Sequence, residues 1–286
     1  MTVIWEREIP DLRHPILVVA FEGWFDVAQG ATGALNWLAE VHESSLVASI
    51  DPEPYYDFTA RRPMVEMVGG ERVIRWPENN CSAVKLPDQT HDLLIISGVE
   101  PHLRWRTFSE DVVDIARRTA TELVITMGAL ADSVPHTRPP AIKGSSTDAA
   151  LAARLGLDRP TYEGPTGLIG VLHDQLAKQR LPVISLRAGV PHYIAGTPNP
   201  KAMRAMLEHL QHVTGVAIET TGLAGRISSW ERQVHAAVES DDDARQYVQQ
   251  LEQQVDQRLA AELPTGDDLA AEFEKFLAER REDDTD

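Results

Sequence analysis

The hydrophobic pattern of the chain alternates between short continuous apolar runs and apolar residues at helical spacing. The continuous runs are typical of strands covered on both faces, and they lie at residues 16–21, 92–97, 122–127 and 183–186. Between them, apolar residues recur every three or four positions, as in Phe108, Val112 and Ile115, which is the spacing of an amphipathic helix. This alternation predicts an α/β fold with a mostly parallel central sheet.

A different pattern interrupts the first half of the chain. Residues 65–68 and 71–76 flank Gly69-Gly70, a dipeptide suited to a two-residue turn, so they predict a β-hairpin. Residues 82–86 predict a third strand of the same insertion. Residues 55–63 mix aromatic and basic side chains, and we interpret them as an amphipathic loop, with a ligand or partner surface as the alternative.

The C-terminal part has a composition of its own. Glutamines and apolar residues at helical spacing follow one another there, and from Glu239 onward there are about 16 acidic and about 5 basic residues. Thr265 and Asp268 predict the start of a last helix. We therefore predict an α/β core domain at residues 1–226 and an acidic helical module at residues 227–286, which contacts the core or another subunit.

Composition and charge narrow the class of protein. A single cysteine, Cys81, excludes an intramolecular disulfide and a multi-cysteine metal site, and the ten histidines show no convincing ligand pattern. We expect neither a metal nor a cofactor. A formal net charge of −17 argues against nucleic acid as a partner. The sequence has no apolar stretch of membrane-spanning length and no signal-peptide pattern, so we expect a cytoplasmic protein without a membrane partner.

Candidate site residues lie where predicted strands end. Gly23 and Asp26 follow the first strand, and Asp26 with Gln29 also has the spacing of a helix capping box. Gly98 and Glu100 follow the strand at residues 92–97. Because open α/β sheets bind ligands beyond the carboxyl ends of their strands, these residues predict a pocket. A plain helix cap for Asp26 and a loop ion pair for Glu100 are the alternatives.

A second group of candidates surrounds a predicted helix start. In Glu163-Gly164-Pro165-Thr166-Gly167, Gly164 and Pro165 predict a turn and Thr166 a helix cap. A helix N-terminus attracts a carboxylate or an anionic ligand, so Glu100 or Glu163 is expected to occupy its N–H donors in the absence of a ligand. His192 and Tyr193 follow the strand at residues 183–186, and acid–base and purely structural roles for His192 both stay open.

Two familiar motifs are missing from the sequence. Ile142-Lys143-Gly144-Ser145-Ser146-Thr147-Asp148 lacks the glycine spacing and the Gly-Lys-Ser/Thr ending of a phosphate-binding loop, so nucleotide binding is not predicted there. Asp148 or Thr147 is instead expected to cap a short helix. The nucleophile elbow Gly-x-Ser-x-Gly is also absent.

Three stretches together resemble the proteasome assembly chaperone family, named for the second eukaryotic assembly chaperone, in its actinobacterial branch. They are Ala20-Phe21-Glu22-Gly23-Trp24-Phe25-Asp26-Val27, Ser97-Gly98-Val99-Glu100-Pro101-His102 and residues 164–202. The resemblance covers roughly residues 1 to 220. It implies a three-layer α/β fold similar to phosphorylase- and hydrolase-like folds, self-association, and no assigned reaction for most bacterial members.

The function that follows is a protein-interaction or assembly role. We expect a homo-oligomer built through the α/β core, and the resemblance implies a proteasome-related protein partner. The printed sequence ends in Asp283-Asp284-Thr285-Asp286, which does not match the hydrophobic-tyrosine-x ending of archaeal and eukaryotic relatives. The alternative is a small-molecule hydrolase or transferase that uses a nucleoside-phosphorylase-like scaffold. Whether the protein is an enzyme stays open at this point.

Overall fold

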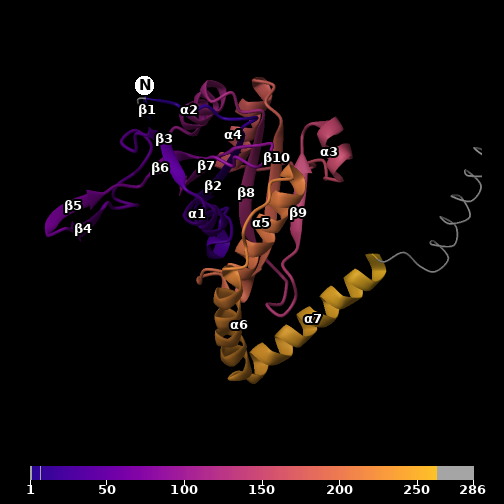
Figure 1. The fold of residues 1–286 in the computed structure, drawn as a ribbon. Coiled ribbons are helices and arrows are strands. Elements are labelled where there is room, and N and C mark those ends of the chain that lie inside the picture. Colours follow the sequence, from indigo (N-terminus) through magenta and orange to yellow (C-terminus); the bar gives the residue numbers. More distant parts are fainter. Residues whose placement is uncertain (1, 7, 263–286) are drawn as a thin grey trace, which may run out of the picture. The chain divides into compact units, whose positions relative to one another are not determined.

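The computed structural model describes residues 2–6 and 8–262 (Figure 1). The chain forms two compact units, one ending at Val234 and the other beginning at His235. The first contains the whole sheet, and the second contains most of the acidic segment. The predicted last helix at Thr265 lies outside the described residues.

The first unit is built on an eight-stranded mixed sheet with the order β1-β3-β6-β7-β2-β8-β10-β9. Its four central strands, β7, β2, β8 and β10, are parallel, and the pairings on both sides of them are antiparallel. The strands are β1 (Val3–Trp5), β2 (Ile16–Glu22), β3 (Ser44–Ile50), β6 (Asn79–Val84), β7 (Leu93–Val99), β8 (Leu123–Asp132), β9 (Ile142–Ser146) and β10 (Val183–Pro191). The α/β fold with a parallel centre is thus confirmed.

Helices cover both faces of this sheet and make the structure three-layered. One core contains alternate β2 residues such as Val18 together with α1 (Thr32–Val41), α5 (Pro200–Thr214) and the start of α6 (Leu223–Glu239). The other contains the intervening residues, such as Leu17, together with α2 (Trp105–Arg118) and α4 (Leu168–Lys178). Strand β2 is buried on both faces, which explains its continuous apolar run.

Side chains cap the starts of two helices, and the first of them, at Asp148, confirms a prediction. Asp148 caps α3 (Ala149–Leu155) by accepting a hydrogen bond from the N–H of Leu151 at 2.9 Å. Asn199 caps α5 by accepting from Lys201 and Ala202, with Pro200 as the first helical residue. The short 3₁₀ turns η1 (Val27–Gln29) and η2 (His192–Ile194) complete the unit.

The predicted hairpin forms a separate two-stranded sheet, β4 (Met64–Val68) and β5 (Glu71–Arg75), which extends away from the central sheet (Figure 1). We call it the arm. The strand expected to follow it as part of the insertion belongs to the main sheet instead. This strand is β6, and it pairs with β3 and β7 because its alternate residues Cys81 and Ala83 are buried in the core.

The second unit contains the end of α6 and the helix α7 (Asp242–Glu262), with Val238, Val248 and Leu251 buried in it. Its compact unit begins later than the expected residue 227. Ile227 packs in the core of the first unit, which places the first turns of α6 with the sheet. An independently folding module stays a prediction. No helix in the described ranges is both long enough and apolar enough to cross a membrane.

Candidate functional site

The carboxyl ends of β2 and β7 form a crevice at the point where the chain changes faces. These two strands are parallel neighbours, with Glu22 opposite Val99 at their ends. The helix after β2 lies on one face of the sheet and the helix after β7 lies on the other. Adjacent strands whose connections diverge in this way leave a crevice, which is where open α/β sheets place their ligands.

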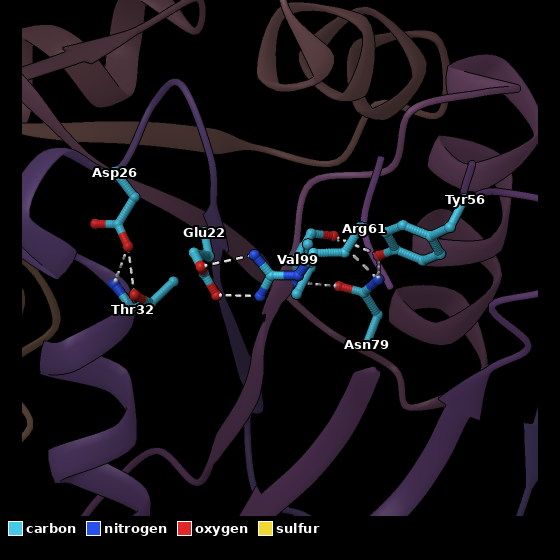
Figure 2. A network of polar contacts seen from close by, with 7 residues as sticks. All are labelled: Glu22, Asp26, Thr32, Tyr56, Arg61, Asn79 and Val99. Atoms are coloured by element: carbon cyan, nitrogen blue, oxygen red, sulfur yellow. Dashed lines mark hydrogen bonds and ion pairs between the residues drawn. The ribbon is translucent and has the colours of Figure 1, made fainter. Parts of the chain in front are cut away.

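An ion pair between Glu22 and Arg61 closes one side of this crevice (Figure 2). Both guanidinium Nη atoms donate to the carboxylate of Glu22, at 3.0 and 2.9 Å, in a bidentate arrangement. The hydrogen bond to Glu22 raises the pKa of Arg61. Arg61 therefore holds the loop before the arm against the end of β2.

A buried polar network continues from Arg61 toward β6, and Figure 2 shows its members side by side. The Tyr56 hydroxyl donates to the carbonyl of Val99 at 2.6 Å, and the Asn79 amide contacts that hydroxyl and the same carbonyl. Asn79 Oδ1 accepts from the Val99 N–H at 3.1 Å. A Cβ at Gly98 would lie 2.0 Å from Asn79 Oδ1, so the network requires glycine there. We call Glu22, Tyr56, Arg61, Asn79 and Val99 the cleft network.

Asp26 is a buried carboxylate at the start of α1, but it does not form the expected capping box. Its carboxylate accepts hydrogen bonds from the N–H of Ala31 at 2.7 Å and from the N–H and hydroxyl of Thr32 (Figure 2). Helix α1 begins only at Thr32 because Ala28 and Gln29 adopt left-handed backbone conformations, with φ of 56° and 50°. Burial raises the pKa of Asp26, and the hydrogen bonds from Thr32 and Ala31 oppose that effect.

Glu100 connects three parts of the crevice. Its Oε2 accepts from the N–H of Trp24 and its Oε1 from the N–H of Leu168, each at 3.4 Å. The carboxylate therefore lies at the start of α4, one of the positions predicted for Glu100. It packs directly over Gly23, where a Cβ would meet Oε2 at 2.7 Å, and beside Gly167. Gly23, Glu100 and Gly167 are thus brought together.

The other residues of the predicted turn lie on the surface. The turn itself forms, and the Tyr162 hydroxyl holds it by donating to the carbonyl of Pro165 at 3.0 Å. Thr166 does not cap α4. The cap position is occupied by Gly167, which has no side chain to accept a hydrogen bond. The Thr166 side chain instead lies over Gly170, in a groove between α2 and α4. Glu163 is exposed.

His192 and Tyr193 lie at the ends of β8 and β10. The Nδ1 atom of His192 is 3.1 Å from the carbonyl oxygen of Asp132, to which it donates when protonated. The Tyr193 hydroxyl lies 2.8 Å from both the backbone nitrogen and Nδ1 of His136. These contacts hold both residues in the loop after β10. Acid–base and purely structural roles for His192 both stay open.

Two hollows adjoin the crevice. One, of about 290 Å³, is lined by Gly23, Asp26 and Arg61 together with Gly196 from the loop after η2. The other, of about 470 Å³, runs from Gly98 along Arg61 to the base of the arm. Within the described part of the chain, no group of three or more His, Cys, Asp or Glu side chains is arranged to hold a metal ion.

Sequence reasoning missed most of the cleft network. Glu22 was visible as the polar residue that ends the first buried run, but it was not singled out. Arg61 and Tyr56 belong to the aromatic and basic segment at residues 55–63, which was interpreted as an amphipathic loop, and both residues bind strand ends of the same chain. Asn79 gave no signal, because its role depends on β6 joining the main sheet beside Gly98.

The fold and the crevice define a three-layer α/β protein with a polar cleft at a topological switch point. The PAC2 family model matches residues 20–238, and the chain belongs to this family. No match is found among curated proteins.

Solved structures of actinobacterial proteins are similar along most of the chain. A PAC2 family protein from Streptomyces avermitilis is 36% identical, with 82% of this chain and 99% of that one covered and a TM-score of 0.77. A Mycobacterium tuberculosis proteasome-assembly chaperone homologue is 34% identical, with the same coverages and a TM-score of 0.74. A protein of unknown function from Corynebacterium glutamicum is 25% identical, with 91% and 99% covered and a TM-score of 0.82.

Proposed function

We propose that the protein has an assembly role and acts by binding another protein chain through the arm, with a second copy of itself as the occupant. The observation that carries the proposal is the exposure of the arm's apolar side chains. Met64 and Met67 are 64% and 68% exposed, and Val65, Val68 and Ile74 are each close to half exposed. Val65, Met67 and Ile74 lie together on one face of the arm, and exposed apolar side chains grouped in this way mark protein interaction sites.

The arm also has little of its own to stabilise it. Within the described residues, it pairs with no third strand, and a two-stranded hairpin is marginally stable in water. Within it, Arg75 pairs with Glu66 at 3.1 Å, and Trp76 stacks edge-on against Phe58 at its base. A partner that covers its apolar residues would supply the missing stabilisation.

The outer edge of β5 is complementary to itself. The two-residue turn places Val68 and Glu71 in a hydrogen-bonded pair, so the N–H and C=O groups of Arg72 and Ile74 point outward. Two β5 strands that pair antiparallel about Val73 place Arg72 opposite Ile74 of the second copy. The same register places Glu71 opposite Arg75 of the second copy, and opposite charges in that position attract.

Charge further favours a second copy at the arm over other surfaces. The chain has a net charge of −17, so two copies repel each other over most of their surface. The arm is neutral, because Glu66 and Glu71 balance Arg72 and Arg75. A two-fold contact at this point brings the copies together where repulsion is weakest. The 34% identical mycobacterial chaperone homologue supports the assembly role.

The test is the oligomeric state of the full chain and of arm variants, measured by sedimentation velocity at micromolar concentration. We expect Ile74→Pro to yield a monomer, because it removes an outward N–H that the arm itself does not use. Ile74→Thr is the matched control, since it keeps that N–H and should stay oligomeric.

A charge exchange sharpens the test. Glu71→Arg and Arg75→Glu should each weaken the oligomer, and the double variant should restore it, because the pairing is reciprocal. A monomeric wild-type chain would contradict self-association. An oligomer that survives Ile74→Pro would overturn the role of the arm and place the interface elsewhere, in the α/β core or the acidic helical module.

A further inference from the structure

A second group of polar side chains lies on the face of the sheet that α4 covers. Strand β10 pairs with β8 on one side and β9 on the other, so Ser185 lies opposite both Thr126 and Ser145. Two residues further along, Arg187 lies opposite Lys143. Residues paired across strands point to the same face, and His173 of α4 contacts Thr126 from above. We call Thr126, Lys143, Ser145, His173, Ser185 and Arg187 the donor cluster.

Hydrogen bonds within the donor cluster leave a surplus of donors. Arg187 Nη1 donates to Ser145 Oγ at 2.9 Å and to Ser185 Oγ at 3.2 Å. A guanidinium has five N–H groups, and those on Nη2 and Nε of Arg187 have no acceptor within residues 2–6 and 8–262. Each serine hydroxyl accepts from Arg187 and keeps its own proton to donate.

The pair formed by Thr126 and His173 adds one more donor. Thr126 Oγ1 lies 2.8 Å from His173 Nε2, so one of the two groups donates to the other. Burial, and then the charge of Arg187, lowers the pKa of His173 to about 4, so the imidazole is neutral at neutral pH. A neutral imidazole has one N–H, and the pair therefore retains one unused N–H or O–H whichever tautomer is present.

The charges of the cluster are also unbalanced. Like charges directly opposite each other on neighbouring strands destabilise a sheet, yet Arg187 and Lys143 occupy such positions. Neither forms an ion pair with any residue that the structure describes. Asp158 lies across β9 from Ser145, and its charge partly offsets the lowering of the Arg187 pKa by burial. Asp132, further along the face, is held by the N–H of Ser133.

We propose that the donor cluster binds a phosphate group, either as inorganic phosphate or as an organic phosphate monoester. A phosphate offers several acceptor oxygens and negative charge, which match the free guanidinium edge, the two hydroxyls and Lys143. The arrangement differs from a phosphate-binding loop because side chains of two strands, and not backbone N–H groups, supply the donors. Neither the assembly role nor the crevice at β2 and β7 requires these residues.

Calorimetric titration of the full chain at constant ionic strength tests the proposal, with inorganic phosphate and phenyl phosphate as probes. Constant ionic strength separates binding from the general screening of an acidic chain. We expect one site per chain. Tighter binding of phenyl phosphate would identify the monoester as the source of the phosphate group, and tighter binding of inorganic phosphate would identify the free ion.

Variants of the donor cluster and its surroundings should change the affinity for phosphate in both directions. Arg187→Gln should weaken binding by at least about tenfold, because it removes a charge-assisted contact. Lys143→Gln should weaken it less, since Lys143 is exposed. Asp158→Asn should tighten it by removing a competing negative charge. Arg232→Gln, at an exposed position of α6, is the control and should bind like wild type.

Two results would overturn the proposal. One is a wild-type chain that binds neither probe. The other is an Arg187→Gln variant that binds as tightly as wild type. If Arg187 had only a structural role, Arg187→Gln would have a lower melting temperature and the wild-type chain would not bind phosphate.

Discussion

The cleft network and the donor cluster are built on adjoining strands of one sheet, and they differ in how the charge of their arginine is paired. In the cleft network, Arg61 donates to both oxygens of the Glu22 carboxylate, and Asn79 uses both its oxygen and its amide group. In the donor cluster, Arg187 donates to two neutral hydroxyls and forms no ion pair within the described residues. The half-buried guanidinium of Arg187 thus lacks a carboxylate partner, which supports the proposed phosphate site.

The two regions also differ in which parts of the chain they connect. The cleft network connects the ends of β2 and β7 to the loop before the arm, so it fixes the backbone from which the arm extends. Apart from the contact between Thr126 and His173 of α4, the donor cluster connects neighbouring strands that backbone pairing already holds together. Changes in the cleft network should therefore affect stability, and changes in the donor cluster should mainly affect binding.

The largest effect is expected for Gly98→Ala, which tests whether the cleft network is rigid. The added Cβ would lie 2.0 Å from Asn79 Oδ1 and 2.6 Å from the carbonyl oxygen of Glu78. Asn79 cannot move without losing its hydrogen bonds to Val99, and the Glu78 carbonyl is backbone at the start of the pairing between β6 and β7, so we expect a loss of about 3 kcal/mol in the free energy of unfolding. Denaturant unfolding measures it.

Gly196→Ala is the matched control, because nothing lies within 4 Å of a Cβ at that position. It should stay within about 0.5 kcal/mol of wild type. If the two alanine variants were equally stable, the cleft network could accommodate the added Cβ. It would then not be rigid, and it would not differ from the donor cluster in its effect on stability.

A smaller effect is expected from pH in the donor cluster. The pKa of His173 is lowered from 6.5 to about 4, so the unfolded chain binds the proton more readily between these values. The contribution of neutral His173 is complete above pH 6.5 and is lost as the pH falls toward 4. Between pH 7 and pH 5, wild type should lose about 2 kcal/mol more than His173→Gln.

The comparison with His173→Gln removes the effect of other groups that titrate in the same range, because they are common to both proteins. Urea unfolding at the two pH values supplies the measurement. Equal losses in the two proteins would mean that folding does not lower the pKa of His173. Phosphate should reduce the difference, since a bound anion beside Arg187 favours the imidazolium.

The sequence predicted the parts of the fold that depend on local pattern. Buried runs such as that of β2 and capped starts such as Asp148 are readable because one segment contains the whole signal. The start of α1 was misplaced because left-handed backbone at Ala28 and Gln29 leaves no mark in the sequence. The division near residue 227 differs because the packing of Ile227 depends on the sheet below it.

The candidate site was predictable in part for the same reason. Glu100 could be expected at the start of α4, since a strand end and a helix start both appear in the sequence. The donor cluster could not, because it depends on the antiparallel register between β9 and β10. Strand β10 was expected to end at Leu186, where polar Arg187 interrupts the apolar run, and that interruption is the centre of the cluster.

The smallest effect is expected for the ion pair of Glu22 and Arg61. Their side chains are 39% and 43% exposed, so water screens the pair and its removal should cost less than about 1 kcal/mol. A double-mutant cycle with Glu22→Gln and Arg61→Gln measures the coupling free energy directly.

The same Arg→Gln change then compares the two regions through their arginines. Arg61→Gln should leave phosphate binding unchanged, because Glu22 already neutralises the charge of Arg61, whereas Arg187→Gln should abolish most of that binding with little change in stability. If Arg61→Gln weakened phosphate binding as much as Arg187→Gln, the anion would bind through general attraction to arginine. A guanidinium with a carboxylate partner and one without would then be equivalent, and charge pairing would not identify a site in this protein.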